Sequence, residues 1–297
     1  MTDTNGLHLF EQCRAMLMGL AYRMLSSRAD AEDAVQDTFV TWQGTDQAAI
    51  RNPTGWLTTI CTRRCIDLLR STHRTRVEYV GTWLPEPIQT PSADMADTRE
   101  DLAPSLATAF LLMLERLTPK ERAAYLLHEI FDTSYQDIAR ILSVRESACR
   151  KLVSRARQNI EHSKVRHVTP VERQDQLLAA FEAAVTSGNV GPLAALLSDE
   201  VELCADGGGK IAALLEVLHG RIAVVGFISQ NLHEYWEDLE WWPTDINGNR
   251  GFILRRGDAT SAAISFAYDE TGQATNIYII RNPAKLVRLD ARGPART

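Results

Sequence analysis

Three glycines followed by a lysine at residues 207–210 form the most suggestive chemical pattern in the chain, because such stretches can cradle a phosphate. A Walker-type loop also needs a glycine five residues before the final Gly-Lys and a hydroxyl residue after the lysine. Cys204 and Ile211 occupy those two positions. The sequence therefore argues against a nucleotide loop. It predicts a tight link between two strands, where glycine permits positive φ, flanked by the opposite charges of Asp206 and Lys210.

The sequence gives little support for a catalytic site or a metal site. The candidate acids and bases in the C-terminal part are Asp206, His219, His233 and Glu234. No spacing rule unites them, so we expect no enzyme, and an activity of the cyclase or isomerase type stays an alternative. Cys61 and Cys65 lie one helical turn apart, but no second Cys/His pair stands at a matching spacing. We therefore expect core cysteines, no metal and no cofactor.

The composition is that of a globular protein with two or three domains: 297 residues, 45% hydrophobic and 24% charged. There is no apolar run of 18 residues and no basic start before an apolar segment, so we expect neither a membrane span nor a signal peptide. The five scattered cysteines suit a reducing compartment. Together these features predict a cytoplasmic protein.

Two separate basic stripes interrupt a chain whose net charge is −6. Local potential, more than the sum of charges, attracts a polyanion, so these stripes are candidate nucleic-acid contacts. The first contains Arg63, Arg64, Arg70, Arg74 and Arg76. The second contains Arg145, Arg150, Lys151, Arg155 and Arg157. After Pro170 the acids outnumber the bases, which makes the C-terminal part a poor DNA binder.

The second stripe lies in a predicted helix-turn-helix. Thr118, Pro119 and Glu121 form a helix start with a capping box, and Ser134 with Asp137 repeats the pattern. A short turn at residues 143–145 precedes a helix with apolar positions on one side and basic ones on the other. Such a helix fits the major groove. A solvated charged face on a helical bundle is the alternative interpretation.

The N-terminal part is predicted to be helical, and a linker follows it. Apolar residues recur at helical spacing over residues 7–25 and 31–42, and a third helix opens at Trp56. Residues 77–103 are rich in proline and read as a linker. The motif WLPEP at residues 83–87 is unusual in a tether, and both a local hydrophobic pin and a docking segment are open interpretations.

The C-terminal part is predicted to be an α+β domain with an antiparallel run of strands. Helices are expected over residues 171–187, 190–197 and 221–235. The strand-like segments are residues 201–205, 211–218, 239–243, 251–256, 261–269 and 275–282.

Residues 21–43, 53–71 and 117–157 resemble the two conserved domains of bacterial extracytoplasmic-function (ECF) sigma factors. The motifs WLPEP, DGGGK (206–210) and NPAKL (282–286) are similar to those of the subgroup with a fused C-terminal SnoaL-like domain. The resemblance implies two all-α sigma domains followed by an α+β cone-shaped domain. Its expected boundaries are 1–76 for region 2, 77–103 for the linker, 104–168 for region 4 and 169–297 for the SnoaL-like domain.

The resemblance also implies roles for individual residues. The acidic second helix would contact core RNA polymerase through Glu32, Asp33, Gln36 and Asp37. The basic third helix would capture the unpaired −10 strand through Arg63, Arg64, Arg70 and Arg74, although the asparagine often found near Arg63 in the family is missing. The helix-turn-helix would read the −35 element through Arg145, Ser147, Arg150, Lys151, Ser154 and Arg155.

By the same resemblance, the C-terminal domain is expected to regulate the sigma domains from within the chain, without a separate anti-sigma factor. The residues expected to make this contact are Trp83, Leu84, Pro85, Asp206, Gly207, Gly208, Gly209, Lys210, Asn282 and Pro283. The expected partners are core RNA polymerase and promoter DNA. A ligand-sensing helix-turn-helix regulator, which would need neither the helix at 31–42 nor the bases of the third helix, is the alternative.

Overall fold

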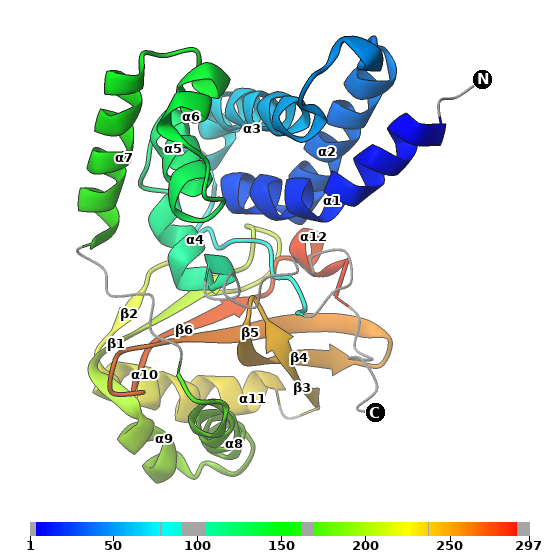
Figure 1. The fold of residues 1–297 in the computed structure, drawn as a ribbon. Helices are drawn as coiled ribbons and strands as arrows, with labels where there is room; N and C mark the ends of the chain where they lie inside the picture. The colour runs from blue at the N-terminus through cyan, green and yellow to red at the C-terminus, as the bar shows by residue number, and fades with distance from the viewer. Residues whose placement is uncertain (1–3, 78, 91–104, 162–168, 237, 290–297) are drawn as a thin grey trace. The chain divides into compact units, whose positions relative to one another are not determined.

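The computed structural model describes residues 4–77, 79–90, 105–161, 169–236 and 238–289, which fall into two compact units (Figure 1). The first unit holds residues 4–77, 105 and 111–161. The second holds residues 79–90, 106–110, 169–236 and 238–289. The part of the expected linker at residues 79–90 therefore belongs to the C-terminal unit, and residues 91–103 of that linker lie outside the described residues.

Three helices form the N-terminal part of the first unit: α1 (Thr4–Leu25), α2 (Arg28–Gln43) and α3 (Pro53–Val77), with the short η1 (Gln47–Ala49) between the last two. Phe10, Leu17 and Leu20 of α1 are fully buried, at the helical spacing of the sequence. Trp42 is also buried, and its indole N–H donates to the carbonyl of Gly6 at 2.9 Å. The predicted helices are therefore present and packed on one another.

The helix-turn-helix follows its predicted start and stop signals. Its helices, after α4 (Thr108–Leu114), are α5 (Pro119–Glu129), α6 (Tyr135–Leu142) and α7 (Glu146–Glu161). Thr118 caps α5 in a complete capping box with Glu121, and Ser134 caps α6. Ser143 ends α6 in the left-handed region, at φ 52°, and turns the chain into α7.

The second unit is built on a six-stranded sheet in the order β2-β1-β6-β5-β4-β3. The strands are β1 (Leu197–Asp206), β2 (Leu218–His219), β3 (Glu240–Ile246), β4 (Asn249–Arg256), β5 (Ala259–Tyr268) and β6 (Ala274–Ile280). The expected antiparallel run is present in β3, β4, β5 and β6, and the sheet is mixed because β1 pairs with β6 in parallel. The expected strand at 211–218 was wrong: only its last residue is in a strand, and the rest is irregular.

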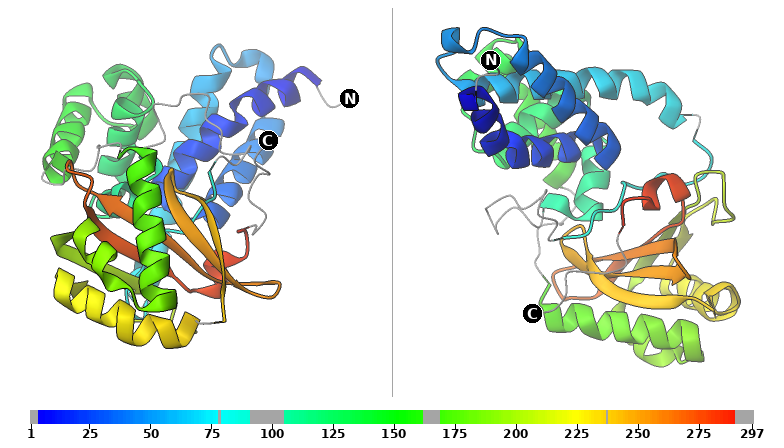
Figure 2. Two further views of the ribbon diagram at one scale, coloured as in Figure 1. Left: turned by 90° about the horizontal axis from the view of Figure 1, so that it is seen from below. Right: turned by 90° about the vertical axis from the view of Figure 1, so that its right-hand side faces the viewer.

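Helices cover one face of this sheet (Figure 2). They are α8 (Val171–Ser187), α9 (Val190–Leu196), and a helical run made of α10 (Arg221–Phe227), the π-helical η3 (Ile228–Leu232) and α11 (His233–Trp236). Phe181 of α8 packs edge-on against Phe266 of β5, with ring centroids 5.5 Å apart. A short helix, α12 (Pro283–Leu286), follows β6. The domain is therefore the expected α+β layer structure.

The linker segment 79–90 continues the structure of the second unit. Leu84 and Ile88 are fully buried, and Gln89 forms a β-bridge with Ile246 at the end of β3. Asn247, also buried and at φ 53°, accepts from the N–H of Ile88 at 3.1 Å and donates to the carbonyl of Leu106 at 3.0 Å. One side chain thus ties together two segments that flank the undescribed part of the linker.

We predict that Asn247→Ala destabilises the protein by about 2–4 kcal/mol. The variant leaves a buried N–H and a buried carbonyl without partners, and places alanine in the left-handed region that asparagine tolerates. Urea unfolding followed by tryptophan fluorescence measures the change. Asn189→Ala is the matched control, because Asn189 is exposed and its side chain makes no capping hydrogen bond. Equal stability of the two variants would contradict the prediction.

Candidate functional site

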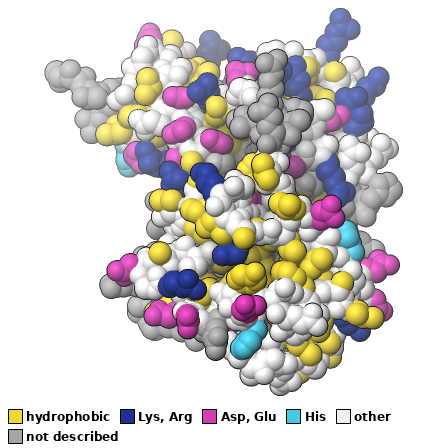
Figure 3. All heavy atoms as spheres, turned by 180° about the vertical axis from the view of Figure 1, so that it is seen from behind, with side chains coloured by type: hydrophobic (Ala, Val, Ile, Leu, Met, Phe, Trp, Pro, Cys, Tyr) yellow, Lys and Arg dark blue, Asp and Glu magenta, His cyan; other side chains and the backbone are white. Residues whose placement is uncertain are grey.

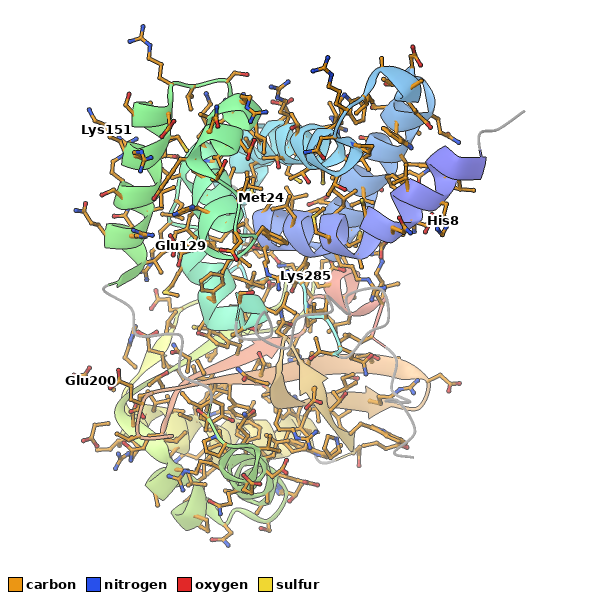
Figure 4. All side chains as sticks on the ribbon, viewed as in Figure 1. His8, Met24, Glu129, Lys151, Glu200 and Lys285 are labelled. Carbon is orange, nitrogen blue, oxygen red and sulfur yellow. The ribbon has the colours of Figure 1, made fainter. Side chains whose placement is uncertain are left out.

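The exposed face of α7 gathers the residues expected to read duplex DNA. Cys149, Leu152, Val153, Ala156 and Ile160 are buried, which fixes the rotation of the helix on α5 and α6. The same rotation exposes Ser147, Arg150, Lys151, Ser154 and Arg155, and Arg145 is exposed in the preceding turn. Lys151 projects from α7 away from the other helices (Figure 4). The predicted −35 residues thus share one accessible surface.

Two arginines of this surface already have partners. The guanidinium of Arg150 pairs with Glu146 at 2.7 Å and lies 4.3 Å from the ring centroid of Tyr135. Arg155 pairs with Glu121 at 3.1 Å while remaining largely exposed. Exposed ion pairs of this kind contribute about 0–1 kcal/mol, so a phosphate or a guanine edge can replace the carboxylate at little cost. Lys and Arg side chains are interspersed with Asp and Glu on the face in Figure 3, rather than forming a continuous basic coat.

The basic residues of α3 have different surroundings. Arg63 donates from Nε to the carbonyl of Ile141 at 2.9 Å and from Nη2 to Ser143 Oγ at 3.1 Å. It therefore satisfies the carbonyl end of α6, the first helix of the helix-turn-helix. Arg64 and Arg70 are exposed and pair with carboxylates on the surface. The side chain of Arg74 lies outside the described residues.

A groove of about 790 Å³ separates the start of α3 from α6 within the first unit. Trp56, Thr58 and Thr59 line one wall, and Asp137 and Arg140 line the other. Trp56 is half-buried, with its ring centroid 5.5 Å from that of Trp42. It is thus both a packing residue and a groove residue, and a groove lined by aromatic and polar side chains can hold unstacked bases.

The residues expected to contact polymerase lie on the outer face of α2. Asp33, Gln36 and Asp37 are exposed and Glu32 is partly buried. Arg28 pairs with Glu32 at 2.9 Å, and Arg64 of α3 pairs with Asp37 at 2.7 Å. The Arg64–Asp37 pair links a predicted DNA residue to a predicted polymerase residue.

The carboxylate of Asp206, at the end of β1, is fully buried and collects four donors. Its Oδ1 accepts from the hydroxyl of Tyr79 at 2.6 Å and from the N–H of Gly208 at 3.0 Å. Its Oδ2 accepts from the N–H of Leu84 at 2.9 Å and from Lys285 Nζ at 2.7 Å. Tyr79 and Leu84 belong to the linker, so this carboxylate holds the linker to the sheet.

All three short motifs meet at this carboxylate. Lys285 of NPAKL also donates to the carbonyl of Leu84 and lies 4.4 Å from the ring centroid of Trp83 in WLPEP. Asn282 Nδ2 donates to the hydroxyl of Tyr79 at 2.8 Å. Pro85 is buried, and Pro283 opens α12. We call this set the Asp206 cluster: Tyr79, Trp83, Leu84, Asp206, Gly208, Asn282 and Lys285.

The glycine stretch contributes backbone shape. Gly208 and Gly209 have φ of +64° and +67°, and a Cβ on Gly208 would lie 2.4 Å from Asn282 Nδ2. Gly207 is buried. The expected pairing of Asp206 with Lys210 was wrong: Lys210 is exposed and Lys285 is the cation that pairs with Asp206. The stretch also does not link two long strands, because the irregular segment 211–217 follows it.

Sequence reasoning did not single out Lys285, although it stands in NPAKL, and it missed Tyr79 entirely. Burial and the hydrogen bond to the Asp206 carboxylate raise the pKa of this phenol well above its usual value, so it remains a neutral donor. Because Tyr79 stands four residues before WLPEP in a segment without periodicity, only proximity to that motif could have indicated it.

Three of the four candidate catalytic residues are tied to separate partners. Asp206 holds the linker, His219 faces Glu202 at 3.2 Å, and His233 Nδ1 lies 2.7 Å from the carbonyl of Val185. Glu234 is exposed. Among the described residues, no group of three His, Cys, Asp or Glu side chains is placed to hold a metal, and Cys61 and Cys65 are buried in α3. In that same part of the chain, no helix is long and apolar enough to cross a membrane.

Family models of two sigma-factor domains match the helical parts of the chain. The model of sigma-70 region 2 matches residues 9–75, and that of sigma-70 region 4 matches residues 107–160. The chain is 34% identical over 236 residues to the ECF RNA polymerase sigma factor SigJ of Mycobacterium tuberculosis, covering 77% of this chain and 74% of that one. It is 35% identical over 190 residues to the probable ECF sigma factor SigI of the same organism, covering 63% and 65%.

The C-terminal domain is included in the structural likeness. The crystal structure of M. tuberculosis SigJ superimposes with a TM-score of 0.71 and 28% identity over 94% of this chain and 98% of that chain. The expected fold class, two all-α sigma domains followed by a SnoaL-like α+β domain, is therefore confirmed. The chain belongs to the extracytoplasmic-function RNA polymerase sigma factors, which bind core polymerase and direct initiation at promoters.

Proposed function

We propose that this sigma factor reads the −35 element with the exposed face of α7, captures the −10 strand with α3, and contacts core polymerase with α2. We further propose that the C-terminal domain regulates these activities within the chain by holding the linker. The observation that carries this second proposal is the Asp206 cluster, in which one buried carboxylate binds linker residues Tyr79 and Leu84.

The linker is a sensitive point of control because it joins region 2 to region 4 in the sequence. Spreading the two modules over −10 and −35 elements requires a linker free to extend. Hydrogen bonds from Tyr79 and Leu84 to Asp206, and burial of Leu84 and Ile88, oppose that extension. The C-terminal domain therefore acts as a restraint on the reach of the linker.

Arg63 provides a second restraint inside the first unit. Its guanidinium binds the end of α6, so it cannot contact a −10 base until the bonds to Ile141 and Ser143 break. Core polymerase, which binds both sigma modules, would supply the energy for that separation. With both restraints in the same chain, a separate anti-sigma factor is not required. The protein acts in the cytoplasm, where polymerase and promoters are found, and its C-terminal domain performs no catalysis.

We predict that Arg150→Ala and Lys151→Ala each reduce promoter-specific transcription about ten-fold with core polymerase alone. A bidentate arginine–guanine contact discriminates by about 1–3 kcal/mol, and phosphate contacts add affinity that falls with salt. In vitro transcription and a polymerase-binding assay are measured in parallel. Binding to polymerase should be unchanged, and Arg255→Ala, in the C-terminal domain, is the control. Full promoter use by both variants would contradict the assignment of α7. No initiation by the unaltered chain would contradict the proposed function.

We predict that Asp206→Ala and Trp83→Ala raise transcription with core polymerase alone, and that their effects are not additive. Both changes weaken the same attachment of the linker, because Lys285 pairs with Asp206 and stacks on Trp83. Hydrogen exchange at the amide of Leu84 should become at least about ten-fold faster in Asp206→Ala, since its acceptor is lost. Asp258→Ala removes an exposed carboxylate as control. Independent effects of the two changes on transcription would count against one shared attachment.

A further inference from the structure

The C-terminal domain contains a cavity of about 200 Å³ that the proposed regulation does not use. It opens between the helical run 221–236, the irregular segment after the glycine stretch, and the ends of β1 and β6. Its apolar wall includes Ala205, Leu214, Phe227, Trp236 and Ile279. A dry cavity of about 150 Å³ suffices for benzene, so this one accommodates a single ring with a short polar substituent.

Arg281 places a positive charge in this largely apolar cavity. Its Nη1 donates to the carbonyl of Ala212 at 2.6 Å, while its buried Nε has no hydrogen-bond partner among the described residues. No carboxylate of the described residues pairs with it. Burial lowers the pKa of this guanidinium, Tyr235 acts in the opposite direction, and Arg256 adds a smaller effect in the direction of burial. A half-buried cation with spare donors and no carboxylate partner among the described residues favours an anionic ligand.

The helix that lines the cavity is irregular at this point. Residues Ile228–Leu232 form a π-helical turn inside the run, and Asn231 and Leu232 of that turn line the cavity. π-helical turns are rare and are found frequently at functional sites. Tyr235, which is 59% exposed, also lines the cavity and offers an aromatic surface to a ligand. The helix irregularity is an observation independent of the charge of Arg281.

We propose that this cavity binds a small organic carboxylate, of one ring or a short alkyl chain. The carboxylate pairs with the guanidinium of Arg281, which presents two parallel donors to such a group. The apolar body packs against Trp236 and Leu214. A neutral molecule of the same shape leaves the guanidinium unpaired and binds more weakly.

The cavity adjoins the Asp206 cluster, so a ligand bound in it changes the contacts that hold the linker. This step rests on the regulatory role proposed above. Ala205 of the cavity precedes Asp206, and the backbone N–H of Arg281 donates to the carbonyl of Asp206 at 2.7 Å. A ligand that draws Arg281 away from Ala212 releases the segment 211–215.

That segment packs on the linker. A Cβ added to Gly81 would lie 3.7 Å from Leu215 Cδ2. Just before the segment, a Cβ added to Gly209 would lie 3.2 Å from Val80 Cβ. Any shift of the segment therefore reaches Val80 and Gly81, next to Tyr79 of the cluster. A bound carboxylate weakens the attachment of the linker by this route.

The test compares phenylacetate with phenylacetamide, which has the same shape and no charge. Calorimetric titration of the full chain should give about ten-fold tighter binding of the acid. Arg281→Met should abolish this preference, Arg281→Lys should retain part of it, and Arg255→Met should leave it unchanged. A thermal melt of each variant checks folding. Equal binding of acid and amide, no saturable binding of either, or an undiminished preference in Arg281→Met overturns the site.

A separate experiment measures whether ligand binding in the cavity weakens the attachment of the linker. Phenylacetate should accelerate hydrogen exchange at the amide of Leu84 in the full chain and leave it unchanged in Arg281→Met. Binding without any change at Leu84 overturns the coupling. Neither experiment contains polymerase or DNA, so their results are separable from a failure of the proposed promoter roles of α3 and α7.

Discussion

The buried carboxylate of Asp206 is the constraint on which the C-terminal half of the structure depends. A fully buried charge is tolerated only when it is paired and hydrogen-bonded, and here the four donors come from three segments distant in the sequence. Removing one donor leaves the others around an undercompensated charge. The end of β1, the linker and α12 therefore form one cooperative piece, although the sequence separates them by up to about two hundred residues.

Because of these contacts, the described part of the linker is a packed segment of the C-terminal domain. Four prolines between residues 85 and 104 would suggest a semi-rigid spacer with few contacts. Instead Leu84, Pro85 and Ile88 are buried, and Asn247 closes the described segment against the sheet. The WLPEP motif thus acts as a docking segment, and the tryptophan supplies a ring against which Lys285 packs. Of the two interpretations open from sequence, docking is the one that the contacts support.

Local signals predicted the local structure well. Thr118 and Ser134 cap the helices that their capping patterns indicated, and the apolar spacing of α7 fixed which of its residues are exposed. The sequence did not predict the contacts between residues far apart in the chain. The parallel pairing of β1 with β6 joins strands far apart in the chain, and nothing in either strand specifies its neighbour. Lys210 seemed the partner of Asp206 because it is near in sequence, whereas Lys285 is near in space.

The two candidate sites also differ in how firmly their charges are held. On α7, Arg150 and Arg155 form exposed ion pairs that contribute little and are weakened by salt, so DNA can displace the carboxylates readily. In the Asp206 cluster, the same kind of charge pair is buried and breaking it leaves an uncompensated charge. Promoter contacts can therefore be exchanged at low energetic cost, but the linker leaves the C-terminal domain only if something else compensates the cluster. Two sources of compensation are those proposed above: the contacts that polymerase makes with the sigma domains, and a ligand that displaces the segment beside Arg281. The proposed DNA-reading surface and the proposed control by the C-terminal domain consequently rest on interactions of different strength.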